Sequence, residues 1–308
     1  MKKTPMTMKK KKCHTFPGWI ESEIGWLSEC GRKGTARTYS AALRSLRKYL
    51  GDEDVALQSV NAALIGGYNA WLSGRNVARN TISFYNRVLR AAYNAAVARG
   101  VVADQHPFGQ VFTGAVETRK RAMTLSLMRR LVAPNLSDSP ELDFARDLFL
   151  LSFILRGMSF VDMAYLRKAD LRDGYLTYYR RKTGHPLRIR WVREIDRILE
   201  KYPSDSRSGY LLPILRGEDD VEREYRNVYA RVNHNLKRLG KMLGMEAPLT
   251  LYVARHTWAS LAQEENYPVS VISAGLGHES ERTTRIYLAA FHTPQADKVT
   301  SHLISLLL

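Results

Sequence analysis

Three side chains with complementary chemistry follow one another near the C-terminus, at Arg255, His278 and Tyr287. A phenol is a poor nucleophile at neutral pH because its ordinary pKa is about 10. It becomes reactive when nearby cations stabilise the charge that develops in the transition state. The arginine fork binds a phosphate through two parallel hydrogen bonds, and a histidine donates a further hydrogen bond or moves a proton. The combination predicts transfer of a phosphodiester onto Tyr287.

Short helices are expected to position these groups. Apolar residues recur at three- and four-residue steps around Arg255, which predicts a helix there. Ser270 is expected to cap a second helix at 271–274, which Gly275 and Gly277 would end, and the tyrosine would follow on a further helical turn. A lone tyrosine usually packs on a helix face and a lone Gly-His is usually a turn, so only the combined pattern is specific.

The order and spacing of these residues resemble the tyrosine recombinase, or phage integrase, family. Members of that family carry an Arg-His pair that opens a helix, then a Leu-Gly-His motif about twenty residues later, and a tyrosine nine residues after its histidine. Here Arg255-His256, Leu276-Gly277-His278 and Tyr287 fit that pattern. The resemblance implies a mainly α fold with a small β-sheet: a helical core-binding domain and a mixed α+β catalytic domain.

The composition favours a nucleic acid partner. The chain has 308 residues, of which 45% are hydrophobic, and this is enough to form two domains with sizeable cores. Its net charge of +17 favours a polyanion, and the Lys and Arg residues are spread over many segments. A protein of membrane surfaces would more often concentrate such residues on one amphipathic helix. We therefore expect double-stranded DNA as the partner.

The cysteines and the apolar runs exclude several other classes. Cys13 and Cys30 are the two cysteines, and they indicate neither a disulfide framework nor a zinc site. The Lys-rich N-terminus is not followed by an apolar run, so it does not predict a signal peptide. No run of eighteen apolar residues exists, and a membrane span is not expected. We expect a cytoplasmic protein without a metal site.

Periodicity and charge divide the chain into four parts. Residues 1–16 form a basic tail that we expect to be disordered. Residues 17–112 follow a helical pattern throughout and resemble the core-binding domain of the family. Residues 113–124 have little periodicity and are interpreted as a linker, and residues 125–308 form the expected catalytic domain. Within that domain, apolar residues at helical spacing predict a long basic helix at 222–243.

Basic residues line two of the predicted N-terminal helices. A helix capped by Thr35 and ending at Leu50 has an apolar stripe opposite its arginines. A helix at 80–99 has a similar pattern, with Ser83 and Asn86 on the same side as its arginines. A basic helix face is often merely solvated, but two such faces in one strongly basic protein favour contacts with DNA phosphates. The predicted DNA-binding residues are Arg37, Arg44, Arg79, Arg87 and Arg90, together with Arg119, Lys120 and Arg121 of the linker.

A second arginine is expected near residue 156. The segment from Arg156 to Leu171 resembles the family box in which an arginine opens a helix that ends in Leu-Arg-x-x-Asp. Counting back from Leu166 places the family arginine at Ser159, one helical turn later than Arg156. We predict that Arg156 reaches the phosphate, while Arg146 or Ser159 itself are the alternatives.

A strand pattern precedes the candidate acid. Residues 175–181 alternate and are rich in aromatic side chains, and 186–191 are expected to return as the partner strand. Lys182 lies in the turn between them, where it resembles the hairpin lysine of the family, and the resemblance implies a general acid. Tyr252 stands where family members commonly have a histidine, and its phenol could still hydrogen-bond the phosphate or the nucleophile. Two alternatives stay open for the proton of the nucleophile: transfer to His278, or loss without strong help.

The resemblance also implies the reaction and the assembly. Tyr287 would form a 3′-phosphotyrosine, no nucleotide triphosphate or other cofactor would be needed, and four protomers would act on DNA. The apolar segment at 299–308 would dock in trans onto a neighbouring protomer. Two alternatives stay open: relaxation of DNA in the manner of a type IB topoisomerase, and sequence-specific DNA binding without catalysis. The target sequence does not follow from the residues.

Overall fold

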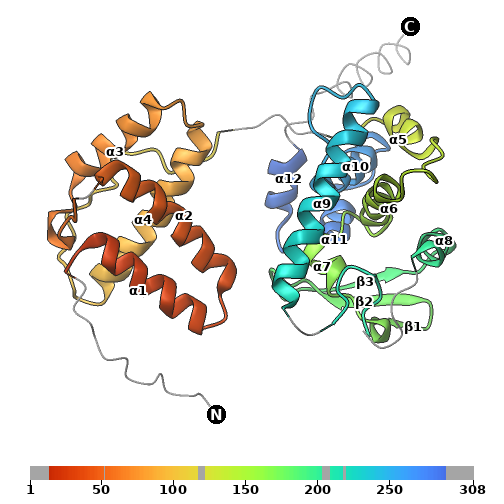
Figure 1. Cartoon of the computed structure of the whole chain (residues 1–308), viewed down its shortest axis with the longest axis horizontal. Coiled ribbons are helices and arrows are strands. Elements are labelled where there is room, and N and C mark those ends of the chain that lie inside the picture. The colour runs from red at the N-terminus through yellow and green to blue at the C-terminus, as the bar shows by residue number, and fades with distance from the viewer. Residues whose placement is uncertain (1–13, 52, 117–121, 203–208, 218–219, 289–308) are drawn as a thin grey trace, which may run out of the picture. The chain divides into compact units, whose positions relative to one another are not determined.

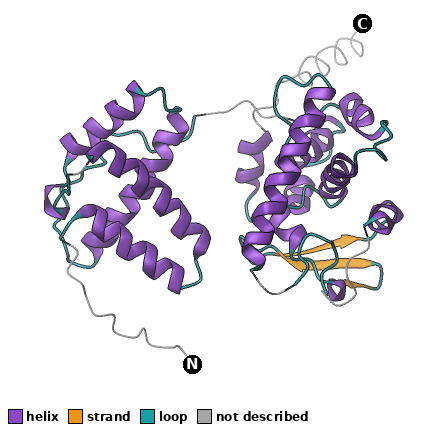
Figure 2. Cartoon of the chain, in the orientation of Figure 1, coloured by secondary structure: helices purple, strands orange, loops and turns teal. Residues whose placement is uncertain are grey.

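The computed structural model describes residues 14–51, 53–116, 122–202, 209–217 and 220–288. The chain separates into two compact units, Met1–Glu117 and Thr118–Leu308. Helices dominate both units, and one small sheet lies in the second unit (Figures 1 and 2). The predicted fold class is therefore confirmed. Among the described residues, none of the helices is long and apolar enough to cross a membrane.

The first unit is a small helical domain around one apolar core. The largest fully buried side chains of this core are Phe16, Ile20, Leu46, Tyr68 and Tyr93. Its elements, in chain order, are α1 Phe16–Glu29, α2 Lys33–Leu50, the short 3-10 helix η1 Leu57–Ser59, α3 Ala62–Gly74 and α4 Arg79–Ala98.

The ends of these helices follow local chemistry. Asn61 caps α3 by accepting a hydrogen bond from the Leu64 amide at 3.0 Å, as expected for an amide side chain at that position. The prediction for α2 was wrong at its start, since Thr35 lies inside the helix and Arg32 is the N-cap residue. Arg32 makes no capping hydrogen bond with its side chain, and the amphipathic pattern of α2 extends past the threonine.

One side of α4 is covered by the segment at 111–116. Ser83 and Asn86 are fully buried there: Ser83 donates a hydrogen bond to the carbonyl of Gly114, and Asn86 donates one to the carbonyl of Phe112. The sequence pattern had placed these two residues on a polar face with the arginines of α4. The prediction failed because these buried polar side chains donate hydrogen bonds to backbone carbonyls of a loop. In the sequence, such residues cannot be distinguished from polar residues that face solvent.

The second unit combines eight helices of the described chain with a three-stranded antiparallel sheet. The sheet order is β1-β2-β3, and the register pairs Leu176 with Ile189 and Tyr179 with Pro186. The elements are α5 Leu125–Val132, α6 Pro140–Ile154, α7 Phe160–Ala164, η2 Lys168–Asp170, β1 Leu171–Arg172, β2 Tyr175–Tyr179, β3 Pro186–Arg190, α8 Arg193–Lys201, α9 Val221–Met242, α10 Leu251–Glu264, α11 Val269–Leu276 and α12 Glu281–Leu288.

The β2–β3 hairpin confirms the predicted strands. Leu176, Tyr178 and Ile189 point into the core, whereas their neighbours along the strands are exposed, which is the alternation of a half-buried sheet. The short strand β1 was not predicted, because two residues carry no periodic signal. The hairpin closes with a 2.9 Å hydrogen bond from the Arg180 amide to the His185 carbonyl.

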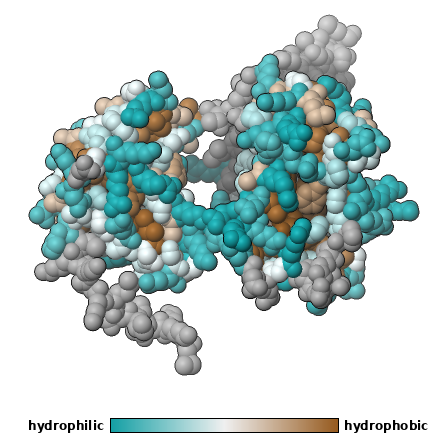
Figure 3. All heavy atoms as spheres, in the orientation of Figure 1, coloured by the Kyte–Doolittle hydropathy of each residue, from teal (hydrophilic) through white to brown (hydrophobic). Residues whose placement is uncertain are grey.

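Helix α6 packs against both α9 and α10 in the core of this unit. Phe149, Leu236 and Ala254 are fully buried at these contacts. The visible surface of each unit is mostly hydrophilic, with hydrophobic patches between the polar side chains (Figure 3). The apolar periodicity of 222–243 thus correctly identified α9 as a half-buried helix.

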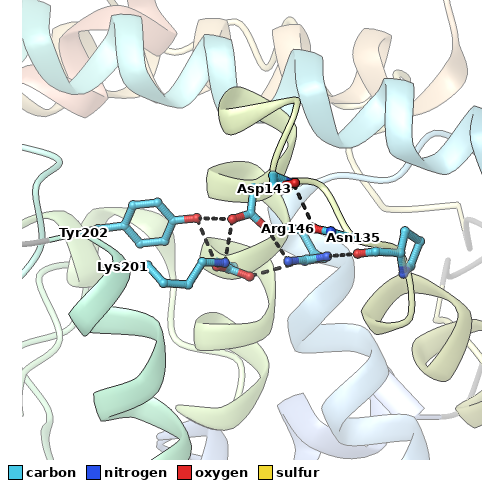
Figure 4. A network of polar contacts seen from close by, with 8 residues as sticks. Asn135, Asp143, Arg146, Lys201 and Tyr202 are labelled. Atoms are coloured by element: carbon cyan, nitrogen blue, oxygen red, sulfur yellow. Dashed lines mark hydrogen bonds and ion pairs between the residues drawn. The ribbon is translucent and has the colours of Figure 1, made fainter.

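An ion-pair network fastens α8 to α6 (Figure 4). Arg146 donates to Asp143 and, at 3.3 Å, to Asp147, and it also reaches the carbonyl of Pro134 at 2.6 Å. Lys201 pairs with both carboxylates, and the Tyr202 hydroxyl donates to them at 3.1 and 3.0 Å. Arg146 is therefore committed to a structural network.

We predict that the Asp143→Asn variant loses about 3 kcal/mol of unfolding free energy near neutral pH, because a charged network would lose one partner. Burial would raise the pKa of Asp143, but the hydrogen bond from Lys201 and the charge of Arg146 outweigh it and lower the pKa below 3.8. A lowered pKa in the folded state gives stability that is present at neutral pH and is lost as the pH falls through that pKa.

The difference between the variant and the parent protein should therefore shrink in acid, which urea unfolding between about pH 7 and about pH 3 measures. Asp138→Asn is the control, because Asp138 is exposed. A difference that stays constant over this pH range would contradict the prediction.

Candidate active site

Arg255 is the buried centre of the site. It lies in the second turn of α10 and is only 7% exposed. Its Nη1 donates to the Gly157 carbonyl at 3.0 Å, and its Nη2 donates to the Leu276 carbonyl at 2.6 Å. The guanidinium is thus held by two backbone carbonyls, one in the turn after α6 and one at the last residue of α11.

Gly157 makes the close approach to Arg255 possible. Its φ is +72°, and a Cβ at this position would lie 2.6 Å from the Cα of Arg255. Both the backbone conformation and the space therefore require glycine. Arg156, the residue before it, also has a positive φ of 60°, which is uncommon for a residue with a side chain. The turn brings a strained backbone next to the buried guanidinium.

The predictions for 156 and 159 need correction in one respect. Arg156 does not open a helix, because α7 begins at Phe160 and Ser159 is its N-cap. The Ser159 hydroxyl accepts from the Asp162 amide at 3.3 Å and donates to the Asp162 carboxylate at 2.7 Å. The other carboxylate oxygen accepts from the Arg181 amide at 2.8 Å. Ser159 therefore holds α7 against the hairpin.

Three arginines act on the end of one buried phenol. Burial raises the pKa of Tyr178, and the carboxylate of Asp162 raises it further. The positive charges of Arg180, Arg255 and Arg156 oppose this shift. The side chain of Arg156 is half-buried.

His278 completes the contact with Arg255. Gly277, with a φ of +62°, ends α11 in the left-handed conformation and turns the chain, so that His278 Nε2 lies 3.1 Å from Arg255 Nη2. The other ring nitrogen, Nδ1, lies 2.8 Å from the hydroxyl of Thr284 on α12. Burial and the nearby positive charges, led by Arg255, lower the pKa of His278 to about 4, so the imidazole is neutral at physiological pH.

The β2–β3 hairpin adds two cations. Arg180 follows β2 and donates to the Gly277 carbonyl at 2.7 Å, which fastens the turn before His278. Lys182 is exposed in the hairpin turn, and its charge also lowers the pKa of His278. Arg180 was not predicted as a site residue. Its position directly after an alternating strand, two residues before Lys182, could have indicated it.

The two tyrosines have different positions. Tyr252, in the first turn of α10, is 58% exposed and lies edge-on to His256 at 4.6 Å between ring centroids. Tyr287 belongs to α12, but its side chain lies outside the described part of the chain. α12 packs against α10 and α11, the helices that carry Arg255 and Leu276. The backbone of Tyr287 is therefore on a helix adjoining the site.

The predicted DNA-binding arginines of the first unit divide into two groups. Arg37, Arg44 and Arg87 are exposed on their helices. Arg79 stacks on Phe112, and Arg90 donates to Thr113 at 3.2 Å, so both also hold the loop that covers α4. The remaining predicted residues of this kind lie outside the described part of the chain: Arg119, Lys120 and Arg121.

Comparison with known families covers most of the chain. Residues 15–111 match the phage integrase SAM-like domain, and residues 145–293 match the phage integrase family. Tyrosine recombinase XerA of Saccharolobus solfataricus is 25% identical over 122 residues, which are 40% of this chain and 37% of XerA. The match thus spans little more than a third of the length of that relative.

Solved structures share the fold. A lambda integrase dimer bound to a COC′ core site superposes with a TM-score of 0.66 and 17% identity, over 87% of this chain and 97% of the integrase chain. A lambda integrase tetramer bound to a Holliday junction gives 0.65 and 19%, over 89% and 77%. The integrase of the Tn1549 transposon, in complex with a circular intermediate DNA, gives 0.64 and 15%, over 95% and 99%.

We predict that Gly157→Ala displaces Arg255 and raises the pKa of His278 from about 4 toward its ordinary 6.5, because the charge of Arg255 is one cause of the lowered value. Titration of the imidazole signal by NMR measures this shift. Gly174→Ala is the matched control, since Gly174 also has a φ of +72° but has no atom within 4 Å of the added Cβ. Equal titration curves for the two variants would contradict the prediction.

Proposed function

The chain belongs to the phage integrase family of tyrosine recombinases, and we propose that it is a site-specific DNA recombinase. In this proposal it cleaves and rejoins DNA through a 3′-phosphotyrosine intermediate. The observation that carries the proposal is the fixed Arg255 guanidinium, which contacts His278, an imidazole on which the positive charges of Arg180 and Lys182 also act. A phosphodiester is the anion that such a cluster fits.

The chemistry assigns one role to each group. The phenol of Tyr287 releases its proton to solvent, and its oxygen forms a bond to phosphorus as the bond to the 5′ oxygen breaks. The leaving oxygen takes a proton from the ammonium of Lys182. Arg255 and Arg156 neutralise the non-bridging oxygens, which carry the growing charge of the transition state. Since the new bond is itself a phosphodiester, rejoining needs no cofactor or nucleotide triphosphate.

The other parts of the proposal concern DNA and assembly. We propose that residues 17–112 grip the duplex through Arg37, Arg44 and Arg87, with Arg79 and Arg90 beside them, and that residues 125–308 carry out catalysis. Relatives of this fold have been solved as a dimer and as a tetramer on DNA. We propose that this protein also acts as a tetramer. We further propose that it acts in the cytoplasm, where DNA is accessible. The predicted docking segment, 299–308, lies outside the described residues.

We predict that Tyr287→Phe abolishes covalent attachment to DNA, because the substitution removes only the attacking oxygen. The target sequence is unknown, so the substrate is a pool of nicked duplexes with randomised cores, in which the nick traps the covalent product. Protein-linked DNA recovered after denaturation is the measurement. The parent protein should yield such DNA, and sequencing it would give the preferred site.

Tyr267→Phe is the control, since Tyr267 is another tyrosine of the same unit, 59% exposed, and should retain attachment. An adduct that survives Tyr287→Phe would reject this residue as the nucleophile. Binding to DNA without any adduct in the parent protein would favour a DNA-binding protein without catalysis. Relaxation of supercoiled plasmids of any sequence would favour activity of the topoisomerase type.

We predict that Lys182→Ala slows cleavage roughly a hundredfold or more, because the leaving oxygen would lose its proton donor. A substrate in which sulfur replaces the 5′ bridging oxygen should restore the rate, since a thiolate leaves without protonation. Rates of adduct formation on the two substrates measure the effect. If sulfur brings no rescue, Lys182 has a role other than general acid.

A further inference from the structure

The contacts of His278 determine which of its nitrogens carries the proton. An arginine side chain has only N–H donors, so His278 Nε2, at 3.1 Å from Arg255 Nη2, must present its lone pair. A neutral imidazole then has its hydrogen on Nδ1, and that nitrogen lies 2.8 Å from the Thr284 hydroxyl oxygen, which accepts the hydrogen bond. A protonated ring is disfavoured here, because it would direct an N–H at another donor of the same charge.

Thr284 is built into the site. Its side chain is fully buried, although α12 has an exposed face on which Arg285 pairs with Glu281 at 3.3 Å. Thr284 belongs to the same helix as Tyr287 and precedes it by three residues. Residues three apart lie on neighbouring positions of a helix surface, so the helix that bears the proposed nucleophile also bears the partner of His278.

We propose that Thr284 is a positioning residue of this active site: its hydroxyl fixes His278 in the Nδ1-protonated tautomer while α12 is docked, so that the Nε2 lone pair accepts the N–H of Arg255. This inference rests on the proposed function. It revises the sequence-based expectation for His278, since a lone pair at Nε2 cannot donate a hydrogen bond to a phosphate oxygen.

The tautomer matters for Arg255. With the lone pair at Nε2, the imidazole accepts from the guanidinium, which also donates to the carbonyls of Gly157 and Leu276. In the other tautomer Nε2 would direct an N–H at the guanidinium, and this hydrogen bond would be lost. Thr284 therefore acts on Arg255 through His278.

The tautomer can be tested without any DNA. The full-length protein, labelled with ¹⁵N in its histidine rings, is compared by NMR with Thr284→Val, which keeps the shape but lacks the hydroxyl, and with Thr284→Ser, which keeps the hydroxyl. His278→Gln assigns the signal. The parent protein and Thr284→Ser should show His278 protonated at Nδ1 and not at Nε2, and Thr284→Val should lose this pattern. The proposal is overturned if the valine variant keeps it.

Thr257→Val controls for the loss of a buried hydroxyl elsewhere. Thr257 is also fully buried, and its hydroxyl accepts from the Met123 amide at 3.0 Å. This variant should unfold at a lower temperature but keep the His278 pattern. A change of the pattern in Thr257→Val as large as that in Thr284→Val would mean that general loosening, and not the hydroxyl of Thr284, moves the proton.

Adduct formation on the nicked DNA pool supplies the second measurement. Thr284→Val should form the adduct roughly tenfold more slowly, and Thr284→Ser should stay close to the parent protein, because a guanidinium that loses the support of His278 stabilises the charge of the transition state less well. Equal rates for the valine variant and the parent would overturn the role of Thr284 while leaving the proposed function intact. If the parent forms no adduct, the proposed function fails, while the NMR comparison still decides the tautomer.

Discussion

The Arg255 guanidinium donates hydrogen bonds to the carbonyl oxygens of Gly157 and Leu276, and this contact joins two segments that are far apart in the sequence. An arginine on the surface would lose conformational entropy each time it bound a phosphate. Here that entropy is lost when the chain folds, since the side chain is 7% exposed and held at both ends. The rest of the site follows from this arrangement: a glycine at 157, a left-handed turn at Gly277 and an imidazole placed against the remaining donor.

Several positive charges near one point repel one another in the absence of an anion. The fold holds them by attaching each to a different rigid element: Arg255 to α10, Arg180 to the end of β2 and Lys182 to the hairpin turn. The imidazole of His278 adapts by staying neutral. Because little reorganisation is needed when a phosphate arrives, the electrostatic stabilisation is available from the beginning of the reaction.

The sequence predicted the elements that have a strong period and the residues that belong to a contiguous motif. Helices such as α4 and α9 and the strands of the hairpin came from apolar spacing, and Arg255 and His278 came from their motifs. Ser83 and Asn86 were misplaced because a buried polar residue that satisfies a loop looks the same in sequence as a solvated one. Arg180 and Thr284 were not found, because each acts through one contact with a residue nearly a hundred positions away or on another helix, and a single contact leaves no periodic signal.

The chain departs from the family pattern at 159 and 252, and the two departures have different consequences. Ser159 removes a cation, but its hydroxyl binds Asp162, whose other oxygen binds the Arg181 amide next to Lys182. The substitution therefore exchanges a charge for a rigid link to the hairpin. Tyr252 exchanges an imidazole for an exposed phenol beside His256. Since a neutral phenol is a weaker proton acceptor than a neutral imidazole, we expect Tyr287 to lose its proton without strong help from residue 252.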